Sequence, residues 1–181
     1  MESKEDELVL LDTNILVYAF AATPEDAQSK DRKNVMRKIV RSKELLRSAL
    51  RGEIRACVAA QNIAEFYSVA TSHIANPVST PQAASIARAL ASSSAIQTIY
   101  ETEESFGELF AWLEAGKTDP EPGARVHDCR LAFAAKASGV SVILTENVDD
   151  FSCFEFISPV NPFREAQEGA PSLRGETWTS R

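Results

Sequence analysis

The stretch LVLLDTNILVYAF, residues 8–20, places a single acid between two apolar patterns. Residues 8–11 form a continuous apolar run, which is typical of a strand buried on both faces of a parallel sheet. The apolar residues at 15–20 recur at helical spacing, so we expect a helix packed back against that strand. Asp12 should then lie at the carboxyl end of a buried strand, where open α/β sheets hold their ligands. A simpler role stays open, because Asp is also a favourable N-cap residue.

Composition indicates one globular domain without membrane spans or structural disulfides. The acidic start, MESKEDE, resembles no signal peptide, and no window reaches the roughly 20 apolar residues of a membrane span, so we expect a cytoplasmic protein. The three cysteines are scattered and suggest neither a disulfide framework nor a zinc site. The net charge of −7 argues against a broad basic surface that grips nucleic acid. Acids gathered around divalent cations would nevertheless present a positive centre to a phosphate.

Strand and helix patterns alternate along the rest of the chain. A charged, strongly basic segment reads as one helix from a Thr23 cap to Arg51, and a solvated helix face explains it better than RNA or partner binding. Further strands are expected at 54–59, 98–100, 140–144 and 156–157, and further helices at 61–74, from 80, from 102 to 116, and at 126–138. This alternation predicts a three-layer α/β/α fold with a short, mostly parallel central sheet. We place one domain at residues 8–162 and a flexible tail at 163–181.

Acids from distant segments fall where such a sheet would gather them. Asp12 follows the first strand, Glu65 lies early in a helix after the second, and Asp128 lies in the first turn of a later helix. Asp149 and Asp150 follow the last clear strand. Each has an ordinary role as a cap, a surface group or a turn residue, but like charges crowded at one edge repel unless a cation neutralises them. Oxygen ligands without His or Cys favour Mg²⁺, with Mn²⁺ as a substitute, and such an ion supports in-line displacement at phosphorus.

Competing nucleotide-binding motifs are missing from the sequence. No Gly-rich loop follows the first strand, and no G-x-x-x-x-G-K-[ST] is present, which argues against dinucleotide-binding and P-loop proteins. Aspartyl-phosphate phosphatases need a second acid two positions after the first, where this chain has Asn14.

Four segments occur in the order LLDTNILVYAF, IAEFYSVA, VHDCRLAFAAKASGVSVILTENVDDF and the I-x-P of residues 157–159. In this combination the chain resembles the PIN domains, and among them the VapC-like toxin ribonucleases, over residues 9–162. The resemblance implies a metal-dependent endoribonuclease that hydrolyses RNA by metal-activated water, with Asp12, Glu65 and Asp128 as metal-binding acids. It also implies a homodimer and, for a toxin, inhibition by a small antitoxin protein.

The chain departs from the family pattern after the last strong strand. The family often has an acid where this chain has Asn147, so we take Asp150 as the fourth site acid, with Asp149 next. Arg130 is a candidate phosphate contact, with packing or an intrahelical ion pair as alternatives. We expect a further set of groups to orient the carboxylates: Thr13, Asn14, Thr145 and Asn147.

The helical region at 27–51 is longer than expected for a minimal toxin. Two other functions therefore stay open. One is a PIN-fold RNA-processing nuclease without an antitoxin, and the other is a non-catalytic protein- or RNA-binding module.

Overall fold

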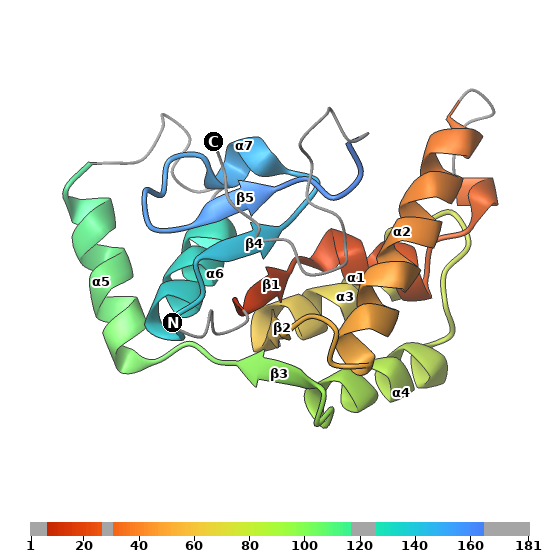
Figure 1. The fold of residues 1–181 in the computed structure, drawn as a ribbon, viewed down its shortest axis with the longest axis horizontal. Coiled ribbons are helices and arrows are strands. Elements are labelled where there is room, and N and C mark those ends of the chain that lie inside the picture. Colours follow the sequence, from red (N-terminus) through yellow and green to blue (C-terminus); the bar gives the residue numbers. More distant parts are fainter. Residues whose placement is uncertain (1–6, 27–30, 117–125, 165–181) are drawn as a thin grey trace, which may run out of the picture.

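A five-stranded parallel sheet forms the centre of the protein, with strand order β3-β2-β1-β4-β5 (Figure 1). The computed structural model describes residues 7–26, 31–116 and 126–164. In the middle of the sheet, Val9 pairs with Ala56 on one side and with Val142 on the other. The strands are β1 Val9–Leu11, β2 Ala56–Ala59, β3 Ile96–Ile99, β4 Val142–Leu144 and β5 Ser158–Val160.

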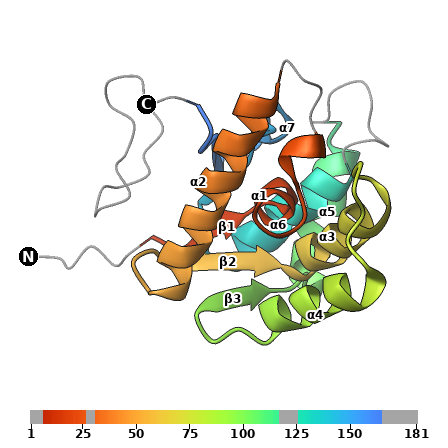
Figure 2. The same cartoon turned by 90° about the vertical axis from the view of Figure 1, so that its right-hand side faces the viewer.

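Helices cover both faces of the sheet, and the alternation of side chains along β1 separates two cores. Val9 and Leu11 pack into one core with residues of α1, α2, α3 and α4, whereas Leu10 packs into the other with residues of α5, α6 and α7. The arrangement of these helices around the sheet can be followed in Figures 1 and 2. The predicted three-layer α/β/α fold is confirmed. The helices are α1 Thr13–Phe20, the 3₁₀ turn η1 Pro24–Asp26, α2 Arg32–Leu50, α3 Ala60–Ser72, α4 Thr80–Ala91, α5 Glu103–Glu114, α6 Val126–Ala137 and α7 Val148–Phe151.

Two predicted elements were misplaced. The last strand lies at 158–160 instead of 156–157, and it contains Pro159, which is tolerated because β5 lies at the edge of the sheet. The long helix begins at Arg32, since Pro24–Asp26 form a separate 3₁₀ turn. Gly52 ends α2 with φ of 71°, as expected of a glycine after a helix.

The ends of the described chain bear on the predicted domain boundary. Phe163, which the sequence assigned to the tail, is 4% exposed and packs edge-on against Tyr18, with ring centroids 5.4 Å apart. The domain therefore extends at least to Phe163. The remainder of the predicted tail, from 165 to 181, lies outside the described residues. None of the helices in the described ranges has the length and apolar character needed to cross a bilayer.

Truncation of a buried side chain in the central strand should destabilise the fold. Leu10→Ala should lower the free energy of unfolding by about 2–5 kcal/mol, because Leu10 is fully buried and its truncation leaves a cavity. Leu50→Ala is the matched control, since Leu50 is 58% exposed and should change stability by less than about 0.5 kcal/mol. Urea unfolding followed by circular dichroism measures both values, and equal losses would contradict this account of the core.

Candidate metal centre at the carboxyl edge of the sheet

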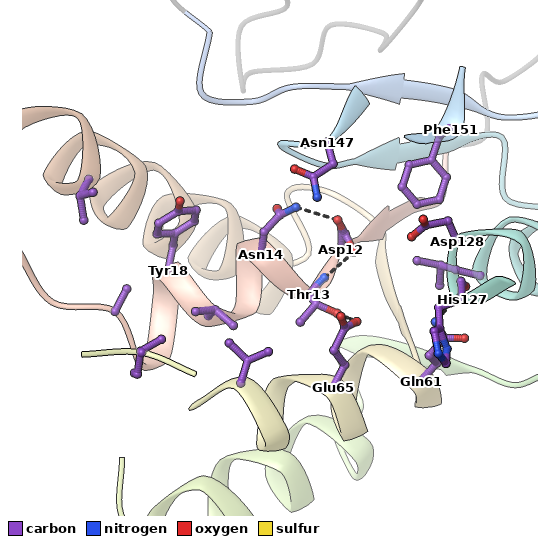
Figure 3. Close-up of a pocket in the computed structure, with 16 residues that line it drawn as sticks. Asp12, Thr13, Asn14, Tyr18, Gln61, Glu65, His127, Asp128, Asn147 and Phe151 are labelled. Atoms are coloured by element: carbon purple, nitrogen blue, oxygen red, sulfur yellow. Dashed lines mark hydrogen bonds between the residues drawn. The ribbon is translucent and has the colours of Figure 1, made fainter. Parts of the chain in front are cut away.

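Asp12 lies at the junction of β1 and α1, where it is 9% exposed and caps the helix. Its Oδ1 accepts a hydrogen bond from the Thr13 backbone N–H at 2.7 Å. Its Oδ2 accepts from the Asn14 side-chain amide at 2.7 Å (Figure 3). The same oxygen accepts from the Thr145 hydroxyl at 2.7 Å. The cap role and a site role are therefore compatible, because these donors fix the carboxylate in one orientation.

The surroundings of Asp12 raise its pKa from 3.8 to about 6. Burial is the largest cause, and the charges of Glu65 and Asp128 add to it, while the bonds from Thr145 and Thr13 oppose it. Since the folded-state pKa lies above the ordinary value, Asp12 favours folding below about pH 3.8, and this contribution is lost as pH rises through about 6. The influence of Glu65 and Asp128 shows that three carboxylates act on one another here.

Glu65 reaches the site through Thr13. The Thr13 hydroxyl donates to Glu65 Oε2 at 2.6 Å, and the fully buried Asn62 donates to Thr13 Oγ1 at 3.0 Å and more weakly to Asp12 Oδ1 at 3.4 Å. Asn62 Oδ1 also accepts from the Ala59 backbone N–H at 3.1 Å. Asn62 was not predicted as a site residue. Its position three residues before Glu65 nevertheless puts both side chains on one helix face.

The turn after β4 closes the other side of the site. Thr145, which is fully buried, donates to Asp12 and accepts from the Asn147 backbone N–H at 3.0 Å. Asn14 Oδ1 accepts from the Glu146 backbone N–H at 3.3 Å. The polar groups expected to orient the carboxylates thus contact them or support the turn beside them.

The side chains around Asp12 line a pocket of about 380 Å³. Asp12, Glu65, Asp128 and Asn147 all line it, and Figure 3 shows Asp12 between Glu65, Asp128 and Asn147. The exposed Asp149 and the half-buried Asp150 lie on α7 outside the residues that line it. The structure therefore brings together three of the four chosen acids and places Asn147, rather than Asp150, beside them.

These side chains fit a hard divalent cation in their chemistry. Carboxylate and amide oxygens are the ligands that Mg²⁺ and Mn²⁺ prefer. A cation between Asp12, Glu65 and Asp128 would offset the charges of Glu65 and Asp128, which add to the larger effect of burial on the Asp12 pKa. Within the described ranges, no three acidic, histidine or cysteine side chains lie close enough to hold an ion together. At this spacing no more than two of the three carboxylates would bind an ion directly, and the third would act through one of the waters that Mg²⁺ retains.

Comparison with known proteins identifies the fold. No protein-family model matches the chain, and no curated protein matches it in sequence. VapC20 of Mycobacterium tuberculosis, a sarcin-ricin loop cleaving toxin, matches with a TM-score of 0.53 at 13% identity, over 82% of this chain and 96% of that one. A toxin-antitoxin complex from Klebsiella pneumoniae matches with 0.52 at 17%, over 85% and 97%. VapBC2 from Rickettsia felis, bound to a DNA fragment from its promoter, matches with 0.52 at 18%, over 85% and 98%. This chain has a VapC-like PIN-domain fold.

In this PIN-like fold, Arg130 is held away from the pocket. Its Nε donates to Glu101 Oε1 at 2.9 Å, and its guanidinium lies over the Phe106 ring at 6.0 Å from the centroid. The ion pair joins α6 to the segment before α5, so it is not the intrahelical pair considered from the sequence. Arg130 therefore ties two elements together instead of lining the pocket.

A second polar cluster of the PIN-like fold connects the basic helix α2 to the site. Lys38 donates to Glu146 Oε1 and, at 3.3 Å, to the Tyr18 hydroxyl, which itself donates to Glu146 Oε2 at 2.9 Å. Burial and the Glu146 carboxylate raise the pKa of Tyr18. Because Glu146 lies between Thr145 and Asn147, this cluster holds the turn that closes the metal centre.

The Thr145 hydroxyl should control the titration of Asp12. Thr145→Val should raise the Asp12 pKa above about 6, because it removes a donor that stabilises the charged carboxylate. Thr98→Val is the matched control, since Thr98 Oγ1 is buried without a hydrogen-bond partner in the described part of the chain. Carboxyl carbon shifts measured by NMR against pH in EDTA report the value. A Thr145→Val protein that titrates like wild type would contradict this role.

Proposed function

We propose that this protein is a metal-dependent endoribonuclease of PIN type, with Mg²⁺ as its natural ion and Mn²⁺ as a substitute. The observation that carries the proposal is the convergence of Asp12, Glu65 and Asp128 on one pocket at the carboxyl edge of a VapC-like PIN fold. VapC20, which shares this fold, is described as a toxin that cleaves the sarcin-ricin loop. RNA hydrolysis accounts for both the acidic pocket and this similarity.

Each of the three acids would hold the ion from a different element of the fold. Asp12 would hold the ion in a fixed place, because Thr13, Asn14 and Thr145 prevent its carboxylate from turning. Glu65 and Asp128 would hold it from α3 and α6, on two other elements. Such an ion supplies, when bound, Lewis-acid chemistry for in-line attack of water on a phosphodiester. Attack by water rather than by the ribose 2′-hydroxyl leaves a 5′-phosphate on the product.

We further propose that the protein is the toxin of a type II toxin-antitoxin pair, acts as a homodimer and is inhibited by a small antitoxin protein. The supporting observation is that two of the matching structures are a toxin, VapC20 of Mycobacterium tuberculosis, and a toxin-antitoxin complex from Klebsiella pneumoniae. An RNA-processing nuclease with the same pocket but no antitoxin is the alternative that a growth experiment separates.

Purified protein should cleave a mixed pool of single-stranded and hairpin RNAs only when Mg²⁺ or Mn²⁺ is present, and the products should carry 5′-phosphates. Asp12→Asn and Asp128→Asn should abolish detectable cleavage. Asn147→Ala should slow it by about 10–100-fold, since the Asn147 side chain lines the pocket. Gel analysis and sequencing of 5′ ends measure these effects.

Asp149→Asn and Asp150→Asn are the controls for these variants, because both acids lie outside the pocket lining and should leave the rate unchanged. Calorimetric titration with Mn²⁺ gives a readout that does not depend on activity. Binding should be lost in Asp128→Ala and retained in Asp149→Ala. Cleavage that persists in EDTA or in Asp12→Asn protein would rule out the proposed mechanism.

Expression of the wild-type protein alone should arrest bacterial growth, because uncontrolled RNA cleavage stops protein synthesis. Asp12→Asn expressed to the same level should not arrest growth, since that variant keeps the fold but lacks the metal ligand. Colony counts and culture density after induction measure the effect. Unimpaired growth with an active enzyme would favour the RNA-processing role.

A further inference from the structure

The pocket continues beyond the acids into an apolar region. We call this region the apolar arm and define it by five half-buried lining residues: Val17, Ala22, Val35, Val69 and Ile74. They come from α1 and the segment after it, from α2, and from α3 with the residues that follow it. Figure 3 shows Thr13, Asn14 and Tyr18 along α1, with Tyr18 on the left of the view and Asp128 on the right. A ligand held at the acids could therefore extend into the arm without leaving the pocket.

The lining of the arm selects against charged groups. Its side chains are aliphatic, and the nearby cation of α2, Lys38, already donates to Glu146 and Tyr18. A phosphate placed against these lining side chains would lose hydration, which is costly, because aliphatic groups offer it no hydrogen bond. A flat, largely apolar group would instead replace water against Val35 and Val69 and gain free energy from burial.

The charge of the protein gives a second reason to expect apolar binding. RNA is a polyanion and the chain has a net charge of −7, so long-range attraction contributes little to binding at physiological salt. Part of the binding free energy must then come from contacts with bases. Base stacking on protein side chains supplies such contacts and depends little on base identity.

We propose that the apolar arm binds one nucleobase, unstacked from the RNA, while the adjoining phosphate lies at Asp12, Glu65 and Asp128. The pocket volume of about 380 Å³ falls within the roughly 300–1,000 Å³ range of sites for small organic ligands. A base can enter only after leaving its stack, which is least costly in single strands, loops and bulges. The substrate of this nuclease is therefore RNA with an unpaired base beside the cleaved bond. This inference rests on the proposed ribonuclease function.

The test measures binding of short single-stranded oligoribonucleotides of mixed sequence to the full chain in buffer that contains Mg²⁺, with fluorescence read on mixing and before cleavage. Each oligonucleotide carries 2-aminopurine at one position, whose fluorescence rises when the base leaves its stack. One position should brighten on binding, and an abasic residue at that position should weaken binding by at least about fivefold.

Val35→Trp should fill the arm, remove the brightening and weaken binding of the intact oligonucleotide by at least about fivefold. Val40→Trp is the matched control on the same helix, since Val40 is 48% exposed and lies outside the pocket lining. Val69→Trp repeats the test from α3, and thermal unfolding checks that each variant is folded. The abasic oligonucleotide should also be tested against Val35→Trp. Replacing the base by an abasic residue should weaken binding to the wild-type protein but should leave binding to Val35→Trp almost unchanged.

The outcomes separate this inference from the proposed function. Equal binding of intact and abasic oligonucleotides, with no brightening at any position, would overturn the base site. This holds even if the wild-type protein cleaves RNA. The apolar arm would then be available to a side chain of a partner protein. Brightening that Val35→Trp and Val69→Trp remove would support the base site even if the cleavage assay fails.

Discussion

The arrangement of the protein depends on one buried carboxylate. Asp12 is 9% exposed and still accepts hydrogen bonds from three separate parts of the chain: the start of α1, Asn62 on α3, and Thr145 after β4. Burial disfavours its charge, so these donors are needed to keep the carboxylate in place. They meet only because β2, β1 and β4 are neighbours in the sheet and end at the same edge. The order of the strands in the sheet therefore determines which side chains meet at Asp12.

The same constraint explains the role of α2, the long basic helix that the sequence could not assign. Most of its charged residues lie on a solvated face, as expected from the sequence. Lys38 differs, because its side chain is only 11% exposed and forms hydrogen bonds with Tyr18 and Glu146. Glu146 in turn is bonded through its backbone N–H to Asn14, which orients Asp12. The helix α2 thus supports, through Glu146, the turn that borders the acidic pocket.

The sequence predicted most of the architecture, for physical reasons that can be named. β1 and β4 were recognisable because a strand buried on both faces needs an unbroken apolar run. Asp12, Glu65 and Asp128, which line one pocket, were chosen because each lies just after a strand or early in a helix. β5 was misplaced because proline opposes strand formation everywhere except at an edge, and sequence does not reveal which strand is at the edge. Asn62 was missed because a buried amide is recognisable only through its partners. Asp150 was preferred to Asn147 on charge, whereas the short helix α7 decides which side chain faces the pocket.

The shape of α1 has a consequence for how this protein can vary. The helix has only eight residues, and each side contacts something different: Thr13 and Asn14 contact the carboxylates, Ile15, Leu16 and Ala19 lie in the core, and Val17 and Tyr18 line the pocket. Little of its surface is left to change freely. The other helices offer pocket residues with fewer duties: Val35 on α2 and Val69 in the later part of α3 line the same pocket, and their aliphatic side chains make no hydrogen bond to the carboxylates. A substitution on α1 therefore disturbs the core, the carboxylates and the pocket wall together, whereas one at Val35 or Val69 changes the pocket wall with less effect on the carboxylates.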